Sequence, residues 1–413
     1  MSSLDNKKQF HAVKVAPQID NHLVVAGKSY SDYMIEGRAA YIYDSQILQQ
    51  RVEKLKQKLP VEIDIHYAIK ANPMPELVDF LADKVDGFDV ASGKELLIAI
   101  NSGMPVEDIS FAGPGKSVHE IEVGVNAGIL FNLESETELE RIVAASEKFG
   151  IEPRVAIRVN PAFELKASGM KMGGGSKQFG IDEEKVPHVI RKMNELGIDP
   201  EGFHIFSGSQ NLRKDAIIES QIKAVDLAIK LANGGLNFKK INIGGGFGIP
   251  YFIGEDELEL DEISENLSML DEKLKTEIKE AKLIVELGRY ISGTSGYYIC
   301  EVLDIKESRE EKFVIVNGGI HHHLAATGNF GQVIRKNYPI AVANKMESDT
   351  LEKVNIVGPC CTPLDIFAAK VELPSIEIGD HIVIFQSGAY GYSASPHDFL
   401  GHGEPRQLFV TGN

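Results

Sequence analysis

Between residues 63 and 288 the chain alternates two kinds of segment. Short apolar runs end in polar or glycine residues, which is typical of buried strands. The longer segments between them carry apolar residues three and four positions apart, which is typical of helices that bury one face. The runs predict eight strands: IDIHYAI (63–69), GFDVA (87–91), DISFAG (108–113), GILFNLE (128–134), RVAIRVN (154–160), GFHIFS (202–207), KKINIG (239–244) and KLIVELG (282–288).

Eight strand–helix units in roughly 225 residues favour a (β/α)8 TIM barrel, a fold that takes about 250 residues. The alternative is an open doubly wound sheet, which usually has fewer strands and carries its glycine signature after the first strand. In this chain the glycine-rich segment GGGFG (244–248) follows the seventh strand instead. We therefore predict an α/β fold built on a TIM barrel.

Beyond residue 290 the pattern changes to β-branched segments separated by turns, such as KFVIVNGG (312–319) and DHIVIFQSGAYG (380–391). This pattern predicts a mostly-β C-terminal domain. The beginning of the chain also looks extended, with NHLVVAGKSY at 21–30. We predict three parts: an N-terminal segment (1–36) that joins the β domain, the barrel (37–290) and the C-terminal β domain (291–413).

Composition and charge narrow the function class. Hydrophobic residues make up 43% of the chain and charged residues 25%, which is enough apolar material for a large core. The formal net charge of −17 argues against nucleic acid or an anionic membrane as partner, because both attract basic surfaces.

The cysteines and the first residues of the chain indicate in which cellular compartment the protein works. The chain has three cysteines, two of them adjacent, and this odd count suggests no disulfide framework and fits a reducing compartment. The start, MSSLDNKKQF, has no apolar signal-peptide region, and no apolar run approaches the ~18 residues of a membrane helix. We expect a cytoplasmic protein.

In a barrel, reactive groups lie at the carboxyl ends of the strands. A lysine is rarely buried without a partner, so Lys70, directly after an apolar run, either points into water or has an amine that reacts. Other chemically active residues occupy the equivalent place on later strands: Asp89, Arg158, His204, Gly244, Gly245, Gly246, Glu286 and Arg289.

The glycines after the seventh strand and Arg289 after the eighth suggest a phosphate site. Glycine leaves backbone amides open to a phosphate, barrels often bind phosphate at these two loops, and a guanidinium adds a charged fork. A phosphate site beside a strand-end lysine and a carboxylate suggests pyridoxal 5′-phosphate (PLP). A lysine amine forms a Schiff base with its aldehyde, and Glu286 would keep the pyridine nitrogen protonated.

Seven short motifs, in their order along the chain, make the sequence resemble the fold type III (alanine-racemase-like) PLP-dependent decarboxylases. This is the group of diaminopimelate, ornithine and arginine decarboxylases. The resemblance extends over residues 35–405. It is carried by YAIKAN (67–72), FDVAS (88–92), HIFSGSQ (204–210), GGGFG (244–248), ELGRY (286–290), GPCCTPLD (358–365) and SGAYGYS (387–393).

The resemblance implies a role for each matched residue. Lys70 would carry the cofactor, His204 would stack on its ring, and Glu286 would contact its pyridine nitrogen. The remaining cofactor-binding residues would be Asp89, Arg158, Ser207, Gly244, Gly245, Gly246, Arg289 and Tyr390. The cysteine motif implies Cys361 as a catalytic residue and Asp365 as a substrate-binding one.

The resemblance also implies the reaction and the assembly. An amino acid would lose its α-carboxylate as CO2, and Cys361 or Lys70 would return a proton to Cα. The enzyme would be a homodimer in which Cys361 and Tyr390 of one subunit complete the site built by Lys70 of the other.

The substrate stays open at this point, because two features conflict. Family members that act on a diamine or diamino acid carry an acidic residue after the motif cysteine, where this chain has Thr362. A hydroxyl cannot compensate a buried ammonium, which favours an acylated or carrier-protein-linked amino acid. Against this, Arg335 and Tyr338 resemble the pair that holds the distal carboxylate of diaminopimelate, the substrate of the group that the chain resembles most.

Each of these residues could also have a purely structural role. Lys70 could be a solvated strand end, Glu286 and Arg289 could pair with each other, His204 could be a core histidine, and Cys361 could be a small buried residue. It is improbable that all of these structural alternatives hold at once. An amino-acid racemase is disfavoured because such enzymes place arginine where Glu286 stands, and a non-catalytic relative is disfavoured by the intact motifs. Three adjacent histidines, His321, His322 and His323, fit no metal-ligand spacing, and we predict that they line the substrate pocket without a metal.

Overall fold

The computed structural model describes residues 10–163, 170–171, 174–206, 208–232, 238–332 and 334–412. The chain forms two compact units. The barrel unit consists of Arg51–Gly248 and Leu258–Gly288, and the β unit consists of Met1–Gln50, Ile249–Glu257 and Arg289–Asn413.

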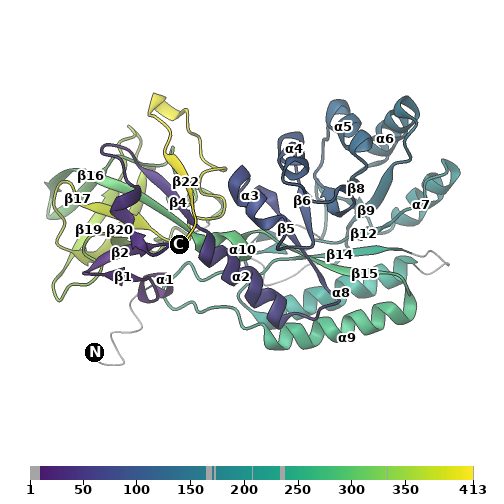
Figure 1. Ribbon diagram of the computed structural model, residues 1–413, viewed down its shortest axis with the longest axis horizontal. Helices are drawn as coiled ribbons and strands as arrows, with labels where there is room; N and C mark the ends of the chain where they lie inside the picture. Colours follow the sequence, from purple (N-terminus) through teal and green to yellow (C-terminus); the bar gives the residue numbers. More distant parts are fainter. Residues whose placement is uncertain are drawn as a thin grey trace. The chain divides into compact units, whose positions relative to one another are not determined.

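The barrel unit contains a closed ring of eight parallel strands, which confirms the predicted TIM barrel (Figure 1). Its first and last members in the ring order, β9 and β8, pair with each other and so close it. In ring order the strands are β9 (Arg154–Asn160), β12 (Gly202–His204), β14 (Lys240–Gly245), β15 (Lys282–Leu287), β5 (Asp64–Ala68), β6 (Gly87–Val90), β7 (Ile109–Phe111) and β8 (Leu130–Leu133). A short strand, β11 (Ile181–Asp182), adds to β9.

All eight predicted strands are present, and their buried runs explain why. Every residue of β6, β7 and β8 is buried, as expected for strands covered on both faces. The helices lie outside the strands (Figure 1). They are α2 (Ser45–Lys58), α3 (Pro75–Leu81), α4 (Gly93–Asn101), α5 (Val118–Ala127), α6 (Glu136–Phe149), α7 (Val186–Glu195), α8 (Lys214–Ala232) and α9 (Asp261–Glu277).

Helix boundaries follow local sequence signals. Helix α5 begins with a capping box, in which the Ser117 side chain accepts from the Glu120 backbone and the Glu120 side chain accepts from the Ser117 backbone. It ends at Gly128, whose φ of 79° is a left-handed conformation that glycine adopts without strain. Helix α6 begins after Ser135, whose side chain accepts from the Glu138 backbone, and it ends at Gly150, which is also left-handed. These caps fix where each crossover turns back to the barrel.

The β unit is built on one mixed sheet of eight strands. Six form the path β18 (Ile340–Val342), β21 (His381–Ile384), β16 (Gly296–Ser308), β17 (Glu311–Val316), β19 (Leu351–Val357) and β20 (Ile366–Pro374). Strand β4 (Ala40–Asp44) pairs with β16 and with β22 (Arg406–Val410). The smaller elements are α1 (His11–Lys14), β1 (Gln18–Ile19), β2 (His22–Val25), β3 (Lys28–Ser29) and α10 (Arg289–Ser292).

The N-terminal segment contributes to the core of this unit. Leu23, Val25 and Tyr30 pack in one buried cluster with residues of β4, β16 and β21. Strand β4 lies within the range 37–290 predicted for the barrel, but it belongs to the β unit, where it pairs with β16 and β22 and all of its residues are buried. The mostly-β C-terminal domain predicted from the turn-separated runs is present.

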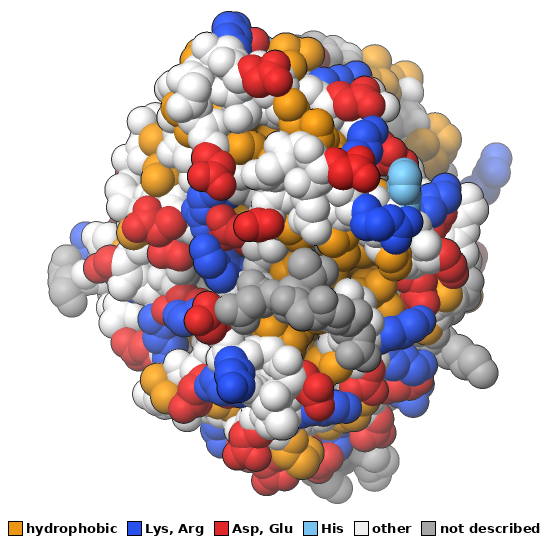
Figure 2. Space-filling view, turned by 90° about the vertical axis from the view of Figure 1, so that its right-hand side faces the viewer, with side chains coloured by type: hydrophobic (Ala, Val, Ile, Leu, Met, Phe, Trp, Pro, Cys, Tyr) orange, Lys and Arg blue, Asp and Glu red, His pale blue; other side chains and the backbone are white. Residues whose placement is uncertain are grey.

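Among the described residues no helix has the length and apolarity that a membrane crossing requires. Acidic and basic side chains are interspersed on the face shown in Figure 2. No group of three or more His, Cys, Asp or Glu side chains in the described part of the chain is arranged to hold a metal ion.

Candidate active site

Lys70 lies where strand β5 ends. The strand stops at Ala68, and Lys70 is the middle residue of a single 3-10 turn, Ile69–Ala71. Its Nζ atom is 3.2 Å from Oε1 of Glu286, and its side chain is 40% exposed whereas that of Glu286 is 4% exposed. The amine therefore has a buried carboxylate partner and still opens outward, which the reading of a solvated strand end does not explain.

Glu286, on β15, also has His204 as a neighbour. Its Oε2 lies 3.2 Å from Nε2 of His204, and both side chains are buried. Burial alone would raise the pKa of Glu286, but the charge of Lys70 and the contact with His204 outweigh burial and hold that pKa well below its ordinary value. The site therefore contains a permanent negative charge next to an accessible amine.

The glycine-rich segment lies beside Glu286. Strand β14 extends through Gly245, one residue past the predicted end, because Gly245 still pairs with Glu286 after a bulge. Gly244 and Gly246 have φ values of 67° and 77°, which favour glycine. A Cβ on Gly245 would collide with the Glu286 backbone, and one on Gly246 would lie 2.6 Å from the Gly208 carbonyl oxygen. Only a segment without side chains fits here.

Asp89 is buried at the end of β6 and joins a chain of polar side chains across four strands. Its Oδ2 is 3.3 Å from Nδ1 of His66 on β5, and its Oδ1 accepts a hydrogen bond from the Ser110 hydroxyl on β7. The Ser110 oxygen accepts in turn from Nδ2 of Asn132 on β8, at 3.1 Å. Asp89 is thus held from both sides inside the barrel.

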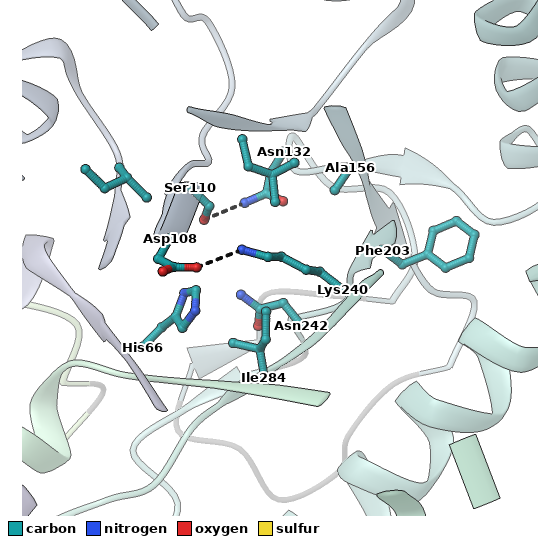
Figure 3. Close-up of a pocket in the computed structure, with 11 residues that line it drawn as sticks. His66, Asp108, Ser110, Asn132, Ala156, Phe203, Lys240, Asn242 and Ile284 are labelled. Carbon is teal, nitrogen blue, oxygen red and sulfur yellow. Dashed lines mark hydrogen bonds and ion pairs between the residues drawn. The ribbon is translucent and has the colours of Figure 1, made fainter. Parts of the chain in front are cut away.

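Figure 3 shows the small cavity next to this chain, with room for about one water molecule. His66, Ser110, Asn132 and Asn242 line it, and at one side Lys240 pairs with Asp108 at 3.2 Å. Most TIM barrels fill this space with bulky branched residues. Sequence reasoning did not find His66, Ser110 or Asn132. Their signal is a polar residue at an inward position of a buried parallel strand.

Arg158, at the end of β9, is buried in an ion pair with Glu134. Its Nη1 is 2.6 Å from Oε1 of Glu134, and its guanidinium lies 4.9 Å from the centre of the Phe179 ring. Glu134 also accepts hydrogen bonds from the backbone amides of Gly113 and Gly180, both at 2.7 Å. Glu134, which the sequence reasoning missed, therefore connects three loops at this end of the barrel.

Two predicted residues, Arg289 and Tyr390, lie together in the β unit. The Arg289 guanidinium is 4.7 Å from the centre of the Tyr390 ring, and its Nη1 donates to the Tyr251 hydroxyl at 2.9 Å. Its Nε is buried without a hydrogen-bond partner among the described residues. Tyr390 has a φ of 56°, an uncommon conformation for a bulky residue that is often found at functional sites.

The remaining predicted residues also belong to the β unit. Tyr338 is buried with its ring 4.7 Å from that of Tyr251, and Arg335 donates to the Ile366 carbonyl at 2.6 Å. Cys361 is exposed. Asp365 is buried, with both carboxylate oxygens bound to backbone amides. Ser207 lies outside the described residues.

Residues 45–293 match the family model described as "Pyridoxal-dependent decarboxylase, pyridoxal binding domain". The chain belongs to this family. The matched segment covers the predicted barrel from residue 45 onward, including Lys70 and Glu286, and the family's cofactor is PLP. The chain is therefore a PLP-dependent decarboxylase, a carboxy-lyase of the diaminopimelate and ornithine decarboxylase group.

Relatives of this decarboxylase extend over nearly the whole chain. An "L-glutamyl-[BtrI acyl-carrier protein] decarboxylase" of Niallia circulans is 38% identical over 89% of this chain and 87% of its own length. A "2-[(L-alanin-3-ylcarbamoyl)methyl]-2-hydroxybutanedioate decarboxylase" of Staphylococcus aureus is 33% identical over 90% and 94%. A solved diaminopimelate decarboxylase of Helicobacter pylori, complexed with L-lysine, matches with a TM-score of 0.82 and 28% identity over 91% and 92%.

The residues of the decarboxylase fit PLP. An aldehyde needs an amine that is accessible, and Lys70 is; a pyridinium needs an ionised carboxylate, and Glu286 is one. In the barrel unit, the side-chain-free segment 244–246 lets a phosphate approach the backbone closely. In the β unit, taken by itself, Nε of Arg289 is buried without a hydrogen-bond partner among the described residues. Nδ1 of His204 is likewise buried without a hydrogen-bond partner among the described residues.

Proposed function

We propose that the enzyme removes the α-carboxylate of an amino acid at the carboxyl end of its barrel, with Lys70 as the cofactor attachment residue. The observation that carries this proposal is the Lys70 amine, open to the outside and 3.2 Å from an ionised, buried Glu286. Glu286 would hold the pyridine nitrogen and His204 one face of the ring. The other cofactor contacts would be Asp89, Arg158, Ser207, Gly244, Gly245, Gly246, Arg289 and Tyr390.

Bound PLP supplies a sink for the electron pair that remains when CO2 leaves. The protein prepares this chemistry with its own groups. Glu286 keeps its negative charge at neutral pH because its pKa is held low, and this charge favours a proton on the ring nitrogen. A proton then replaces CO2 at Cα, and we propose Cys361 or Lys70 as its donor.

Borohydride reduction followed by peptide mapping tests the attachment. The cofactor should be found on Lys70 in the wild type and nowhere in Lys70→Ala. Fixation on a different lysine of the wild type would refute this assignment.

For the substrate, we infer an amino acid whose distal end carries carbonyl or carboxylate oxygens and no free ammonium. The distal-recognition residues implied by the family are Arg335, a cation, and Thr362, which is neutral. This set matches an acyl or carrier-linked group, because an ammonium buried without an anion costs several kcal/mol. The two relatives named for a carrier-linked glutamyl group and for a carbamoylmethyl-linked alanine support the same class.

A panel of substrates tests this inference. We expect kcat/KM for a γ-glutamyl pantetheine thioester or an N-acylated diaminopropionate to exceed that for meso-diaminopimelate, lysine and ornithine by about 100-fold or more. Thr362→Glu should reduce this ratio, whereas the matched control Thr362→Ser should preserve it.

Diaminopimelate is the second candidate, because Arg335 and Tyr338 resemble the pair that holds its distal carboxylate and because relatives such as that of Aquifex aeolicus, 32% identical, carry this activity in their names. Full turnover of meso-diaminopimelate by the wild type would favour it.

We also propose a homodimer with shared active sites, working in a reducing compartment such as the cytoplasm. Support comes from the exposed position of Cys361 and from the three free cysteines. Mixing inactive Lys70→Ala and Cys361→Ala subunits should restore about a quarter of wild-type activity, since half of the dimers would be mixed and each would hold one intact site. No recovery after confirmed subunit exchange would show that both residues act within one chain, and recovery of the activity in a non-cytosolic cell fraction would contradict the compartment.

A further inference from the structure

The two adjacent cysteines of the GPCCTPLD segment have opposite surroundings. Cys361 is exposed, whereas Cys360 is 7% exposed. The Cys360 sulfur lies 3.2 Å from Nδ1 of His321, the first of the three adjacent histidines. Burial and the negative charge of Asp365 raise the pKa of Cys360 to about 12, so its thiol keeps its proton and can donate it to His321.

His321 is suited to accept that hydrogen bond. Burial lowers the pKa of His321 to about 3, so the ring is neutral at neutral pH and one ring nitrogen has a free lone pair. Its ring packs 3.9 Å from that of His322 and 5.0 Å from that of His402, measured between centroids. His322 is fixed in turn, because its Nε2 donates to the Gly403 carbonyl at 2.6 Å and its Nδ1 accepts from the Tyr298 hydroxyl at 2.9 Å.

Asp365 joins the same two segments from another side. Its Oδ2 accepts from the Cys360 amide at 2.8 Å, and its Oδ1 accepts from the Ile320 amide at 2.6 Å. Gly319 and Gly358 surround the carboxylate, and a Cβ on either one would collide with it. Two glycines therefore form a socket that only this carboxylate occupies, with both oxygens turned to the backbone.

The segment is closed by its own backbone as well. The Thr362 amide donates to the Cys360 carbonyl at 2.7 Å, the Asp365 amide to the Thr362 carbonyl at 3.2 Å, and the Gly358 amide to the Asp365 carbonyl at 3.0 Å. The loop from Gly358 to Asp365 is thus tied at its base, and Cys361 lies in its exposed part.

We propose that Cys360, His321 and Asp365 form a buried clamp that turns Cys360 inward and presents Cys361 as the reactive thiol of the pair. His321 and Asp365 are positioning residues for Cys361. Sequence reasoning placed His321 in the lining of the substrate pocket and Asp365 among the substrate-binding residues. The clamp instead gives both residues a role in shaping the cysteine loop. The consequence for catalysis rests on the proposed function of Cys361.

Thiol labelling of the holoenzyme without substrate tests the clamp directly. Iodoacetamide followed by peptide mapping should modify Cys361 at least about 100-fold faster than Cys360 in the wild type, because reaction needs an accessible thiolate. Equal modification of the two residues would overturn the proposal.

Variants then separate the parts of the clamp. Asp365→Ala should expose Cys360 to the reagent and lower kcat about 10- to 100-fold with a smaller change in KM, because a displaced group loses alignment and not substrate binding. His321→Leu should act in the same direction, whereas Cys360→Ser, which keeps a donor for His321, should retain most of the activity. Cys300→Ala is the matched control, since Cys300 is also buried, lies on β16 and is outside the clamp.

Hydrogen exchange on the wild type keeps the test independent of whether a variant folds. The amides of Cys360 and Ile320 should be among the protected amides of their loops, and rapid exchange of both would overturn the clamp. If Asp365→Ala exposes Cys360 while Cys361→Ser keeps full kcat, the clamp stands and the catalytic role of Cys361 fails.

Discussion

The two ends of the barrel carry the same kinds of charged residue in opposite arrangements. At the amino end, the ion pairs are partly exposed to solvent: Lys282 with Asp64, Arg154 with Glu201, and Lys240 with Asp108. At the carboxyl end, the buried Glu286 is shared by His204 and by Lys70, whose side chain remains open. The carboxyl end therefore holds the buried negative charge of Glu286 next to the solvent-accessible amine of Lys70.

This difference shows how one fold separates stability from reactivity. Exposed ion pairs contribute little free energy and leave no group ready to react. A buried carboxylate between two nitrogen groups fixes their charges and positions, which is what a catalytic site needs. Changes at the two ends should therefore differ in kind as well as in size.

The largest effect is expected for Glu286→Gln. Loss of the charge that Lys70 and His204 face should lower kcat by about 10²- to 10³-fold. Because the folded protein lowers the pKa of Glu286, its ionised form stabilises the wild type above the pKa of about 4.3 that it has when unfolded, and this contribution is lost as pH falls below that value. The difference in free energy of unfolding between wild type and variant should shrink between pH 7 and pH 3 in urea titrations.

An intermediate effect is expected for Glu134→Gln, which weakens the buried pair with Arg158 at the same end of the barrel. Removing one partner of a buried pair typically costs about 3–5 kcal/mol of unfolding free energy, and the shift of Arg158 should also lower kcat about tenfold. Urea unfolding and steady-state kinetics measure both. Glu140→Gln, an exposed change on the same helix–strand unit, is the control, and equal losses in the two variants would argue against a special role of the buried pair.

The smallest effect is expected for Lys282→Met at the amino end. The Lys282 side chain is 63% exposed, so the loss should stay below about 1 kcal/mol and kcat should not change. A fall in kcat similar to that of Glu286→Gln would remove the distinction between the two ends.

Much of the barrel could be predicted from the sequence, because parallel strands are buried on both faces and appear as continuous apolar runs. The eight runs and the residues that follow them identified Lys70, His204 and Glu286 at equivalent strand ends. The side-chain contacts of the site residues could not be predicted from the sequence. His66 meets Asp89 only through the register of β5 and β6, and Glu134 meets Gly180 across a long insertion.

For the β unit, the sequence predicted a mostly-β domain but not the pairing of its strands. Its strands were recognisable by composition, but β4 comes from the far end of the chain and lies between β16 and β22, while β17 pairs in parallel with β19. Such long-range pairings depend on which apolar faces meet, and a single run does not encode that.

The sequence by itself determined the barrel and the cofactor class and predicted the lysine that would hold the cofactor, because local apolar periodicity and the order of short motifs carry this information. Only the tertiary structure decided the charge state around that lysine and the unlike surroundings of Cys360 and Cys361. Identical neighbours in sequence acquire different chemistry because burial and hydrogen-bond partners come from segments that lie far away along the chain.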